Sequence, residues 1–251
     1  MKNKIFPCIW FGHEINEAVN FYCDTFPSSK IKQKTSAATV FEIENFTIMA
    51  LGDVSGKSPN ATMSFYVMCE TVDEINIIWE KLADNGNILI PIETYPWSAK
   101  YGWVEDKYGV SWQLSLGEIS DMGQKITPML MFSGNQYGKA EEAINFYISI
   151  FEKSEFHFLS RYKGRDKLQN GKISHGQFNL LGKPFATLDS VIFQDLSFSI
   201  GNSIVVNCDT QTEVDYYWSM LTDDDAKSRS GWLKDRFGLS WQIVLSMKRF
   251  N

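Results

Sequence analysis

The chain is poor in the residues that usually build metal and disulfide sites, with four cysteines and three histidines among 251 residues. No two cysteines have the Cys-x-x-Cys spacing of zinc ribbons and redox motifs. Four cysteines are also too few for a secreted disulfide scaffold of this length, so we expect reduced, buried thiols. Three histidines cannot supply a histidine-rich ligand set, and the sequence indicates neither a bound metal nor a cofactor.

Positive charge and long apolar runs are also scarce. The formal net charge of -6 argues against nucleic acid and anionic membranes as partners. No stretch approaches the roughly 20 apolar residues of a membrane-spanning helix. The apolar run near the N-terminus contains Pro7 and leads into His13 and Glu14, which excludes a signal peptide. We therefore expect a cytoplasmic protein whose partner is a small molecule, and homodimer formation stays open.

One module is written twice in the chain. The segment EAVNFYCDTF (17–26) matches EAINFYISIF (142–151), and DKYGVSWQLS (106–115) matches DRFGLSWQIV (235–244). Between them, 71–82 matches 210–221 in the same order. An internal repeat of this length indicates that the chain contains two copies of the same structural module. We divide the chain into a first module, 1–120, and a second module, 121–251.

Each module reads as strand, helix, strands, helix, strands. Apolar residues recur at helical spacing over 15–26 and 140–151, so each segment presents one apolar stripe to a core. The second helix of each module opens with a Thr-x-x-Glu capping box, at Thr71 and Thr210. Strand-like runs lie at 39–43, 46–51 and 63–70, with counterparts at 175–181, 184–189 and 202–209. The fold class is α+β.

These motifs resemble those of a known family. The EA-[VI]-NFY helix and the Gly-Trp-[VL]-x-Asp-x-[YF]-Gly-[VL]-Ser-Trp-Gln strand are similar to the PhnB-like branch of the vicinal oxygen chelate superfamily. That superfamily includes glyoxalase I, bleomycin-resistance proteins and extradiol dioxygenases. The resemblance implies two tandem βαβββ modules that form a pseudo-dimer, with sheets curled into cups around a ligand.

The branch often carries the label demethylubiquinone methyltransferase, which implies a nucleotide-derived methyl donor. Such donors usually bind a glycine-rich loop between a strand and a helix. No loop of that kind follows any predicted strand, so the sequence does not support the label as an activity.

The resemblance also locates the metal-ligand positions of metal-using relatives. One ligand lies on the first strand, where the pattern places Pro7 and Pro128. A glutamate on the last strand is the other, and Gln113 and Gln242 occupy that position. Proline has no side-chain donor atom, and a neutral amide binds a divalent cation weakly. We therefore predict a degenerate site without metal.

Strand alternation then predicts the residues that line the cups. On the last strands, Ser111 and Gln113 share one face, as do Ser240 and Gln242. On the first strands, the predicted lining residues are Ile9 and Phe11 in one module and Leu130 and Phe132 in the other. An apolar cup with a few neutral hydrogen-bonding groups is typical of a small-molecule site. The alternative is that these side chains fill the cup.

Three further candidates stand out. His175 is the best candidate for catalytic acid–base chemistry, since imidazole titrates near neutral pH, although a lone histidine is more often structural. Trp103 and Trp232 occupy matched positions and are suited either to stacking on a planar ligand or to anchoring the core. The segment 86–100 is largely missing from the second module, and we expect a loop there that covers the cup.

Three functions remain open from the sequence. The first is a metal-free small-molecule-binding protein, comparable with the bleomycin-resistance type. The second is an enzyme of the same superfamily, of the lyase or dioxygenase kind or another, acting through His175 or through a recruited metal. The third is a structural or interaction module with a filled cup. The sequence names no ligand.

Overall fold

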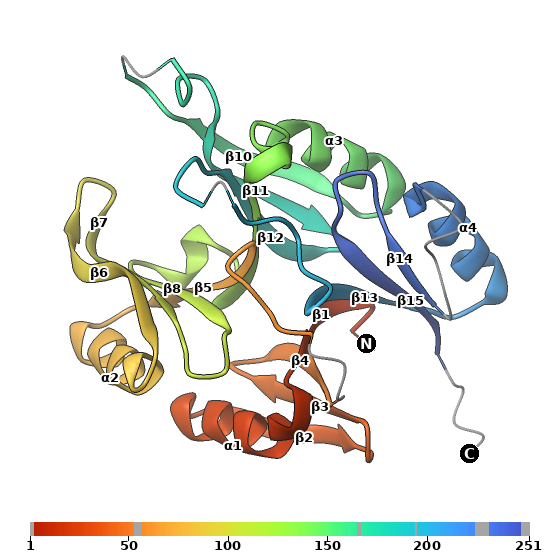
Figure 1. Cartoon of the computed structure of the whole chain (residues 1–251), viewed down its shortest axis with the longest axis horizontal. Coiled ribbons are helices and arrows are strands. Elements are labelled where there is room, and N and C mark those ends of the chain that lie inside the picture. The colour runs from red at the N-terminus through yellow and green to blue at the C-terminus, as the bar shows by residue number, and fades with distance from the viewer. Residues whose placement is uncertain (1–2, 53–56, 165–166, 194, 224–230, 247–251) are drawn as a thin grey trace.

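The computed structural model describes residues 3–52, 57–164, 167–193, 195–223 and 231–246. It confirms an α+β fold with two repeated modules, and each module proves to be composite (Figure 1). The first module contains two successive βαβββ units, β1 to β4 with α1 and β5 to β8 with α2. The second module opens with a third such unit, β9 to β12 with α3. Among the described residues the fourth unit comprises β13, α4, β14 and β15.

The elements of the first module are β1 (Ile5–Trp10), η1 (Gly12–Glu14), α1 (Ile15–Thr25), β2 (Ser29–Lys34), β3 (Ala38–Ile43), β4 (Phe46–Leu51), β5 (Met63–Cys69), α2 (Val72–Ala83), β6 (Asn87–Tyr95), β7 (Ser98–Glu105) and β8 (Ser111–Leu116). After the turn η2 (Ile119–Asp121), those of the second module are β9 (Ile126–Phe132), η3 (Gly134–Gln136), α3 (Ala140–Ile150), β10 (Glu155–Arg161), β11 (Ile173–Leu180), β12 (Lys183–Asp189), β13 (Asn202–Cys208), α4 (Gln211–Leu221), β14 (Trp232–Lys234) and β15 (Ser240–Leu245). Within the described part of the chain, no helix combines the length and apolar character that crossing a membrane requires.

Strands from both modules share each of the two sheets. Sheet A has seven strands in the order β14-β15-β13-β1-β4-β3-β2, and sheet B has eight in the order β10-β11-β12-β9-β5-β8-β7-β6. The modules join through antiparallel pairs, β1 with β13 and β5 with β9. Each sheet therefore combines one unit from the first module with one from the second. The division near residue 120 stays a prediction about the repeat and does not separate the sheets.

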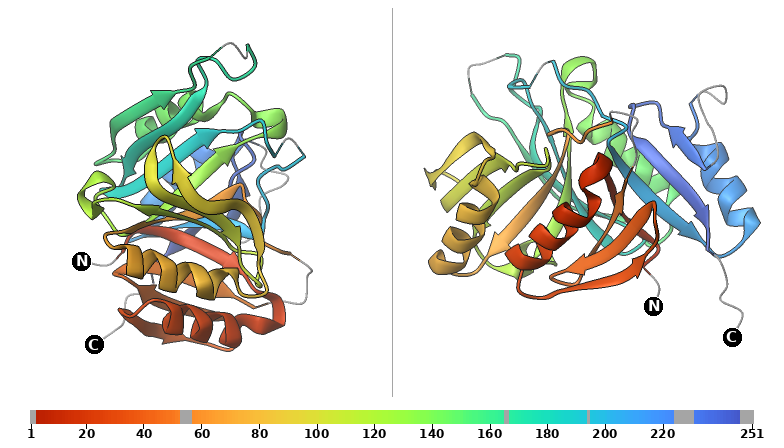
Figure 2. Two further views of the ribbon diagram at one scale, coloured as in Figure 1. Left: turned by 90° about the vertical axis from the view of Figure 1, so that its left-hand side faces the viewer. Right: turned by 60° about the horizontal axis from the view of Figure 1, so that its bottom comes forward.

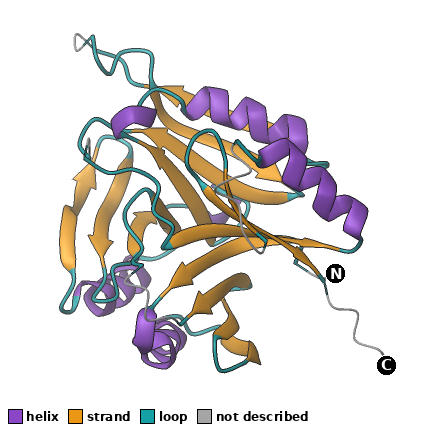
Figure 3. Ribbon diagram, turned by 45° about the vertical axis from the view of Figure 1, so that its right-hand side comes forward, coloured by secondary structure: helices purple, strands orange, loops and turns teal. Residues whose placement is uncertain are grey.

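The four helices cover one face of each sheet. Helices α1 and α4 pack on sheet A, and α2 and α3 pack on sheet B. Figures 1 and 3 show α1 beside α2 at one end of the molecule and α3 beside α4 at the other, and the left view of Figure 2 shows α1 beside α2 from a further side. One apolar core belongs mainly to each module, with Trp112 buried under α1 and α2 and Trp241 buried under α3 and α4. Among the described residues, no helix packs on the opposite face of either sheet; we name this face of sheet A face A and that of sheet B face B.

Local sequence signals explain the helices. The predicted stripe of α1 is buried at Ala18, Val19 and Tyr22. The capping box at Thr71 is confirmed, since its Oγ1 accepts a hydrogen bond from the Glu74 amide at 3.2 Å. The Glu74 carboxylate accepts from the amide of Glu70, the residue before the cap, at 2.9 Å. Thr210 and its partner glutamate repeat the same arrangement at α4.

The expected loop at 86–100 is instead the β6–β7 hairpin, which ends sheet B as its outermost arm. Its pairing contains register shifts between Ile88 and Ile90 and beyond, which bend the hairpin. Tyr95 and Trp97 lie at its tip, with ring centroids 5.0 Å apart. The backbone of this insertion pairs with itself and with β8, so it behaves as an extension of the sheet.

Candidate functional site

Face B brings together polar side chains from three neighbouring strands. The Tyr101 hydroxyl donates to Oε1 of Gln113 at 2.7 Å. Nε2 of Gln113 donates to Oγ of Ser64 at 2.8 Å and lies 3.1 Å from Sδ of Met129. Strand β8 places Gln113 beside Tyr66 of β5, because these residues are register partners. The predicted binding residue Gln113 therefore lies at the centre of a satisfied, uncharged network.

Methionines form the apolar part of face B. The buried cluster on this face contains Ala61, Met68, Trp103, Met122, Met129, Met131, Ala186 and Leu188. Methionine is unbranched and flexible, so a methionine-rich surface fills a space and can also rearrange around a ligand. In the described conformation these side chains occupy the interior of the cup.

Trp103 and Ser111 lie at one edge of this cluster. The Trp103 indole Nε1 donates to Oγ of Ser111 at 2.6 Å, and both residues are buried. Phe193, from the connection between β12 and β13, packs against the Trp103 ring with centroids 5.3 Å apart. The structure places Ser111 and Gln113 on one face, as the alternation of the last strand predicted, and adds Trp103 to that face.

His175 reaches the same face from β11. Its ring lies 6.0 Å from that of Tyr66, and its Nε2 is 3.1 Å from Nε2 of Gln177. The amide nitrogen of Gln177 donates, so the imidazole nitrogen accepts and the ring is neutral. Burial lowers the pKa of His175 to about 4. At neutral pH this histidine is a hydrogen-bonding group and a weak base, which does not favour the acid–base role.

The first strands present the opposite residues from those predicted. Ile9 and Phe11 belong to the core beneath α1, and the Phe11 ring is 5.9 Å from that of Tyr22. Leu130 and Phe132 belong to the corresponding core beneath α3. All four are corrected from cup lining to helix-packing residues. Their places on the faces are taken by Phe6, Cys8 and Trp10 on β1 and by Thr127, Met129 and Met131 on β9.

The physical reason is an inserted turn. The resemblance placed the first-strand ligand at Pro7, and Ile9 and Phe11 were assigned to the same face; the 3-10 turn η1, which begins at Gly12 with φ 58°, separates this strand from α1. Because side chains alternate along a strand, an error of one residue exchanges the two faces. Both faces of this strand carry apolar residues, so its sequence does not distinguish them.

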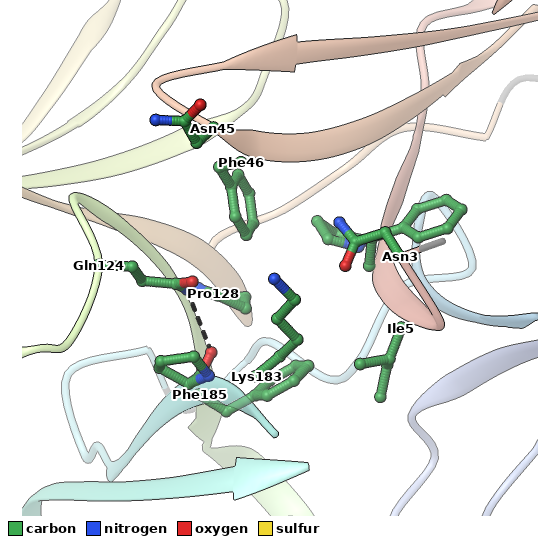
Figure 4. A pocket seen from close by; sticks show the side chains of 11 residues that line it. Asn3, Ile5, Asn45, Phe46, Gln124, Pro128, Lys183 and Phe185 are labelled. Carbon is green, nitrogen blue, oxygen red and sulfur yellow. Dashed lines mark hydrogen bonds between the residues drawn. The ribbon is translucent and has the colours of Figure 1, made fainter. Parts of the chain in front are cut away.

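Pro7 and Pro128 consequently lie away from both faces. They meet at the junction between the modules, where Phe46 and Phe185 also line a small crevice (Figure 4). Its cavity volume of about 10 Å³ has room for a single water molecule. Gln124 closes one side by donating to the carbonyl of Pro184 at 3.3 Å. This crevice is a seam between modules and is too small for an organic ligand.

Face A repeats the network of face B with changes. Nε2 of Gln242 donates to Oγ of Ser203 at 2.9 Å, as Gln113 does to Ser64. Cys8 lies beside both residues, and burial raises the pKa of its thiol to about 12. The predicted residues Trp232, Ser240 and Gln242 share this face because β14, β15 and β13 are register neighbours.

The donor set on either face does not fit a divalent metal. Gln113 and Gln242 engage serine through their amide nitrogens, and the first-strand residues nearest them are Cys8 and Met129. A thiol with a pKa near 12 is protonated at neutral pH, and metal ions bind the thiolate. The described residues contain no group of three or more His, Cys, Asp or Glu side chains placed to hold a metal ion. No step of the chemistry is therefore assigned to a metal.

Comparison with known proteins identifies the family. The family model described as 3-demethylubiquinone-9 3-methyltransferase matches residues 3–115 and again 124–244. The chain belongs to this PhnB-like family of the vicinal oxygen chelate superfamily. The double match shows that the internal duplication of this PhnB-like protein is a duplication of the whole family domain.

Two solved structures show what the chain is similar to. The PhnB protein of Bacillus cereus is 35% identical over 46% of this chain and 100% of its own, with a TM-score of 0.43. Glyoxalase I from Zea mays is 10% identical and covers 96% of this chain and 91% of its own, with a TM-score of 0.61. At that identity the glyoxalase likeness shows the fold alone. A comparison with curated proteins gave no match.

Proposed function

We propose that this PhnB-like protein binds a small, uncharged, planar organic molecule on face B, without a metal. The observation that carries the proposal is the ring of neutral hydrogen-bonding groups around flexible methionines, centred on Gln113. Such a combination of apolar lining and few convergent polar groups is what small-molecule sites use. Binding and sequestration, rather than chemistry, is the role that these residues support best.

An unpaired hydroxyl supports the same site. Oγ1 of Thr127 is buried on face B and has no hydrogen-bond partner among the described residues. Thr127 is the register partner of Tyr66, which in turn lies beside Gln113. A buried hydroxyl without a partner costs roughly 1–3 kcal/mol, which a ligand group can recover. The ligand is therefore expected to offer Thr127 a hydrogen-bond acceptor or donor.

The neutrality of the ligand follows from the titratable groups on the face. His175 is uncharged at neutral pH, and Glu105, the register partner of Ser111, is an acid whose pKa is raised by burial. A ligand carboxylate placed near Glu105 would meet an acidic group, while a cation at the centre would contact the neutral Gln113 network and a thioether sulfur. An uncharged aromatic ligand avoids both costs.

Binding requires the methionines to move. The described packing places Met129 against Gln113 and leaves the cup filled, so a ligand must displace the thioether and form its own contact with the Gln113 amide. Rotation of unbranched side chains costs little compared with displacement of branched ones. The alternative of a permanently filled cup predicts no binding at all, and the same experiment decides between them.

Calorimetric titration of the full chain with uncharged bicyclic compounds tests the proposal. The panel comprises 2,3-dimethyl-1,4-naphthoquinone, coumarin and quinazolin-4-one. At least one member is expected to bind with one-to-one stoichiometry. Gln113→Ala is expected to weaken that binding about tenfold, the loss of roughly one good hydrogen bond.

The matched control is Gln242→Ala, which removes the equivalent amide from face A and should leave affinity within twofold. Urea unfolding of both variants checks that the fold is retained. No heat of binding from any panel member, or equal affinity in wild type and Gln113→Ala, would overturn the proposal.

A further inference from the structure

The rings of two tryptophans, Trp10 and Trp232, are in contact on face A. Trp10 lies on β1 and Trp232 on β14, and β13 and β15 separate these strands in the sheet. In a flat sheet three strand spacings amount to about 14 Å, yet the ring centroids are 5.6 Å apart. The sheet is curled, and the rings close over the side chains of the intervening strands, which include Ser203, Ser240 and Gln242.

Two buried polar atoms in this region lack a partner. Oγ of Ser240 and Nε1 of Trp10 receive no hydrogen-bond partner from any described residue. Ser240 is 1% exposed, so water does not compensate its hydroxyl. The repeat supplies an internal comparison, because Ser111 occupies the same position on face B and accepts from Trp103 at 2.6 Å. Trp232, the counterpart of Trp103, packs instead against Trp10.

The charge beside this serine is reversed between the two faces. The sequence Gly-Trp-Val-Glu-Asp (102–106) corresponds to Gly-Trp-Leu-Lys-Asp (231–235). Glu105 is thus the register partner of Ser111 on face B, and Lys234 is the register partner of Ser240 on face A. An acidic group borders one serine and a cation borders the other.

Further lysines surround face A. Nζ of Lys57 lies 4.1 Å above the centre of the Trp10 ring. On the β2–β3 side, Lys30 and Lys32 both approach the Glu42 carboxylate, at 2.7 and 3.2 Å, so that pair of strands carries an excess of positive charge. Lys234 is therefore the charged group that borders Ser240, and its cation favours an anion there.

We infer that face A is a second ligand site, distinct from face B, that takes a planar aromatic carboxylate between Trp10 and Trp232. The ring of the ligand stacks on the indoles, and its carboxylate accepts from the Ser240 hydroxyl and faces Lys234. The Trp10 Nε1 donor offers a further hydrogen bond to the ligand. Trp232 lies on the three-residue edge strand β14, which lets its ring move aside for entry.

The test compares two probes that differ in charge, 2-naphthoate and 2-naphthamide, by calorimetric titration of the full chain. Naphthoate is expected to bind at least tenfold more tightly, and its affinity should fall severalfold between 50 and 500 mM salt because the attraction is partly electrostatic. Lys234→Glu, which installs the charge found at the corresponding position of face B, is expected to reduce naphthoate affinity at least tenfold.

Ser240→Ala is expected to reduce naphthoate affinity about fivefold, whereas Ser111→Ala, its repeat counterpart, should have no effect. Urea unfolding confirms that each variant retains its fold. The inference is overturned if naphthoate does not bind, if Lys234→Glu leaves its affinity unchanged, or if Gln113→Ala abolishes it. That last result would move the anion to face B, while loss of binding by the uncharged panel alone affects only the proposed function.

Discussion

Replacing Asp106 with alanine is expected to remove a buried carboxylate that ties the last turn of the first module to its helix. Oδ2 of Asp106 accepts from the Tyr22 hydroxyl and from Nε1 of Trp112, each at 2.8 Å. Oδ1 accepts from the amides of Tyr108 and Val110 at 2.8 and 3.1 Å. Asp235 makes the same four bonds in the second module.

The expected cost follows from two opposing contributions. Where the carboxyl is protonated, its removal leaves four buried donors without an acceptor at about 1.5 kcal/mol each, which amounts to about 6 kcal/mol. Burial raises the pKa of Asp106 to about 6, and the four hydrogen bonds oppose the shift without cancelling it. Removing a carboxylate with a pKa about two units above its ordinary value returns about 3 kcal/mol at pH 7.5. The net cost of Asp106→Ala is therefore about 3 kcal/mol at that pH.

The sign of the pH dependence distinguishes this reasoning from a simple loss of packing. The folded pKa of Asp106 lies above the unfolded value, so its contribution to stability is largest at low pH and is lost as pH rises through about 6. The cost of the substitution should therefore grow by about 2 kcal/mol between pH 7.5 and pH 4.5. His175 titrates in the opposite direction, but it does so in both proteins and cancels in the difference.

Urea unfolding of wild type and Asp106→Ala at the two pH values measures these quantities, with Asp235→Ala as a replicate in the other module. Tyr22→Phe removes one of the four hydrogen bonds and should cost about 1.5 kcal/mol. A cost below about 1 kcal/mol at pH 7.5, or a cost that is the same at both pH values, would refute the account of a desolvated carboxylate.

Three further outcomes are expected. In Gly201→Ala the new Cβ would lie 1.9 Å from the Ser58 carbonyl oxygen, so the β4–β5 and β12–β13 connections must move apart. Calorimetry should show a melting temperature several degrees lower than that of the wild type, and an unchanged value would contradict the close approach. Thr71→Ala and Thr210→Ala should each cost about 1 kcal/mol in urea unfolding, and no loss in either would show that the caps do not act. Burial lowers the pKa of His175 to about 4, so its contribution to stability is lost as pH falls from about 6.5 to 4; an NMR titration that gave a pKa above 6 would be inconsistent with the buried ring.

Much of the fold could be predicted from local pattern. The apolar stripes and the Thr71 capping box depend on residues within one or two helical turns, and the duplication is visible as matched segments; the structure and the family match confirm them. The faces of the last strands were also predictable, because the Asp-x-x-Gly turn fixes their register and places Trp112 towards the helices and Gln113 away from them.

The candidate site was only partly predictable. Alternation gave the wrong face for Ile9 and Phe11, since the turn η1 has no strong sequence signature beyond Gly12 and shifts the count by one. Tyr66 and Met129 were missed for a related reason, because their importance depends on neighbours contributed by other strands. The segment 86–100 was read as a loop because the alternation of its hairpin is interrupted by bulges.

The sequence by itself determined the repeated domain, the amides at Gln113 and Gln242, and the opposite charges of Glu105 and Lys234. Only the tertiary structure decided what these residues face, because each sheet combines strands from both modules and each face draws on segments far apart in the chain. Matched positions therefore acquired different surroundings: Trp103 donates to its neighbouring serine, while Trp232 packs against Trp10. The sequence specifies each side chain, whereas strand pairing across the whole molecule decides whether a buried polar group finds a hydrogen-bond partner.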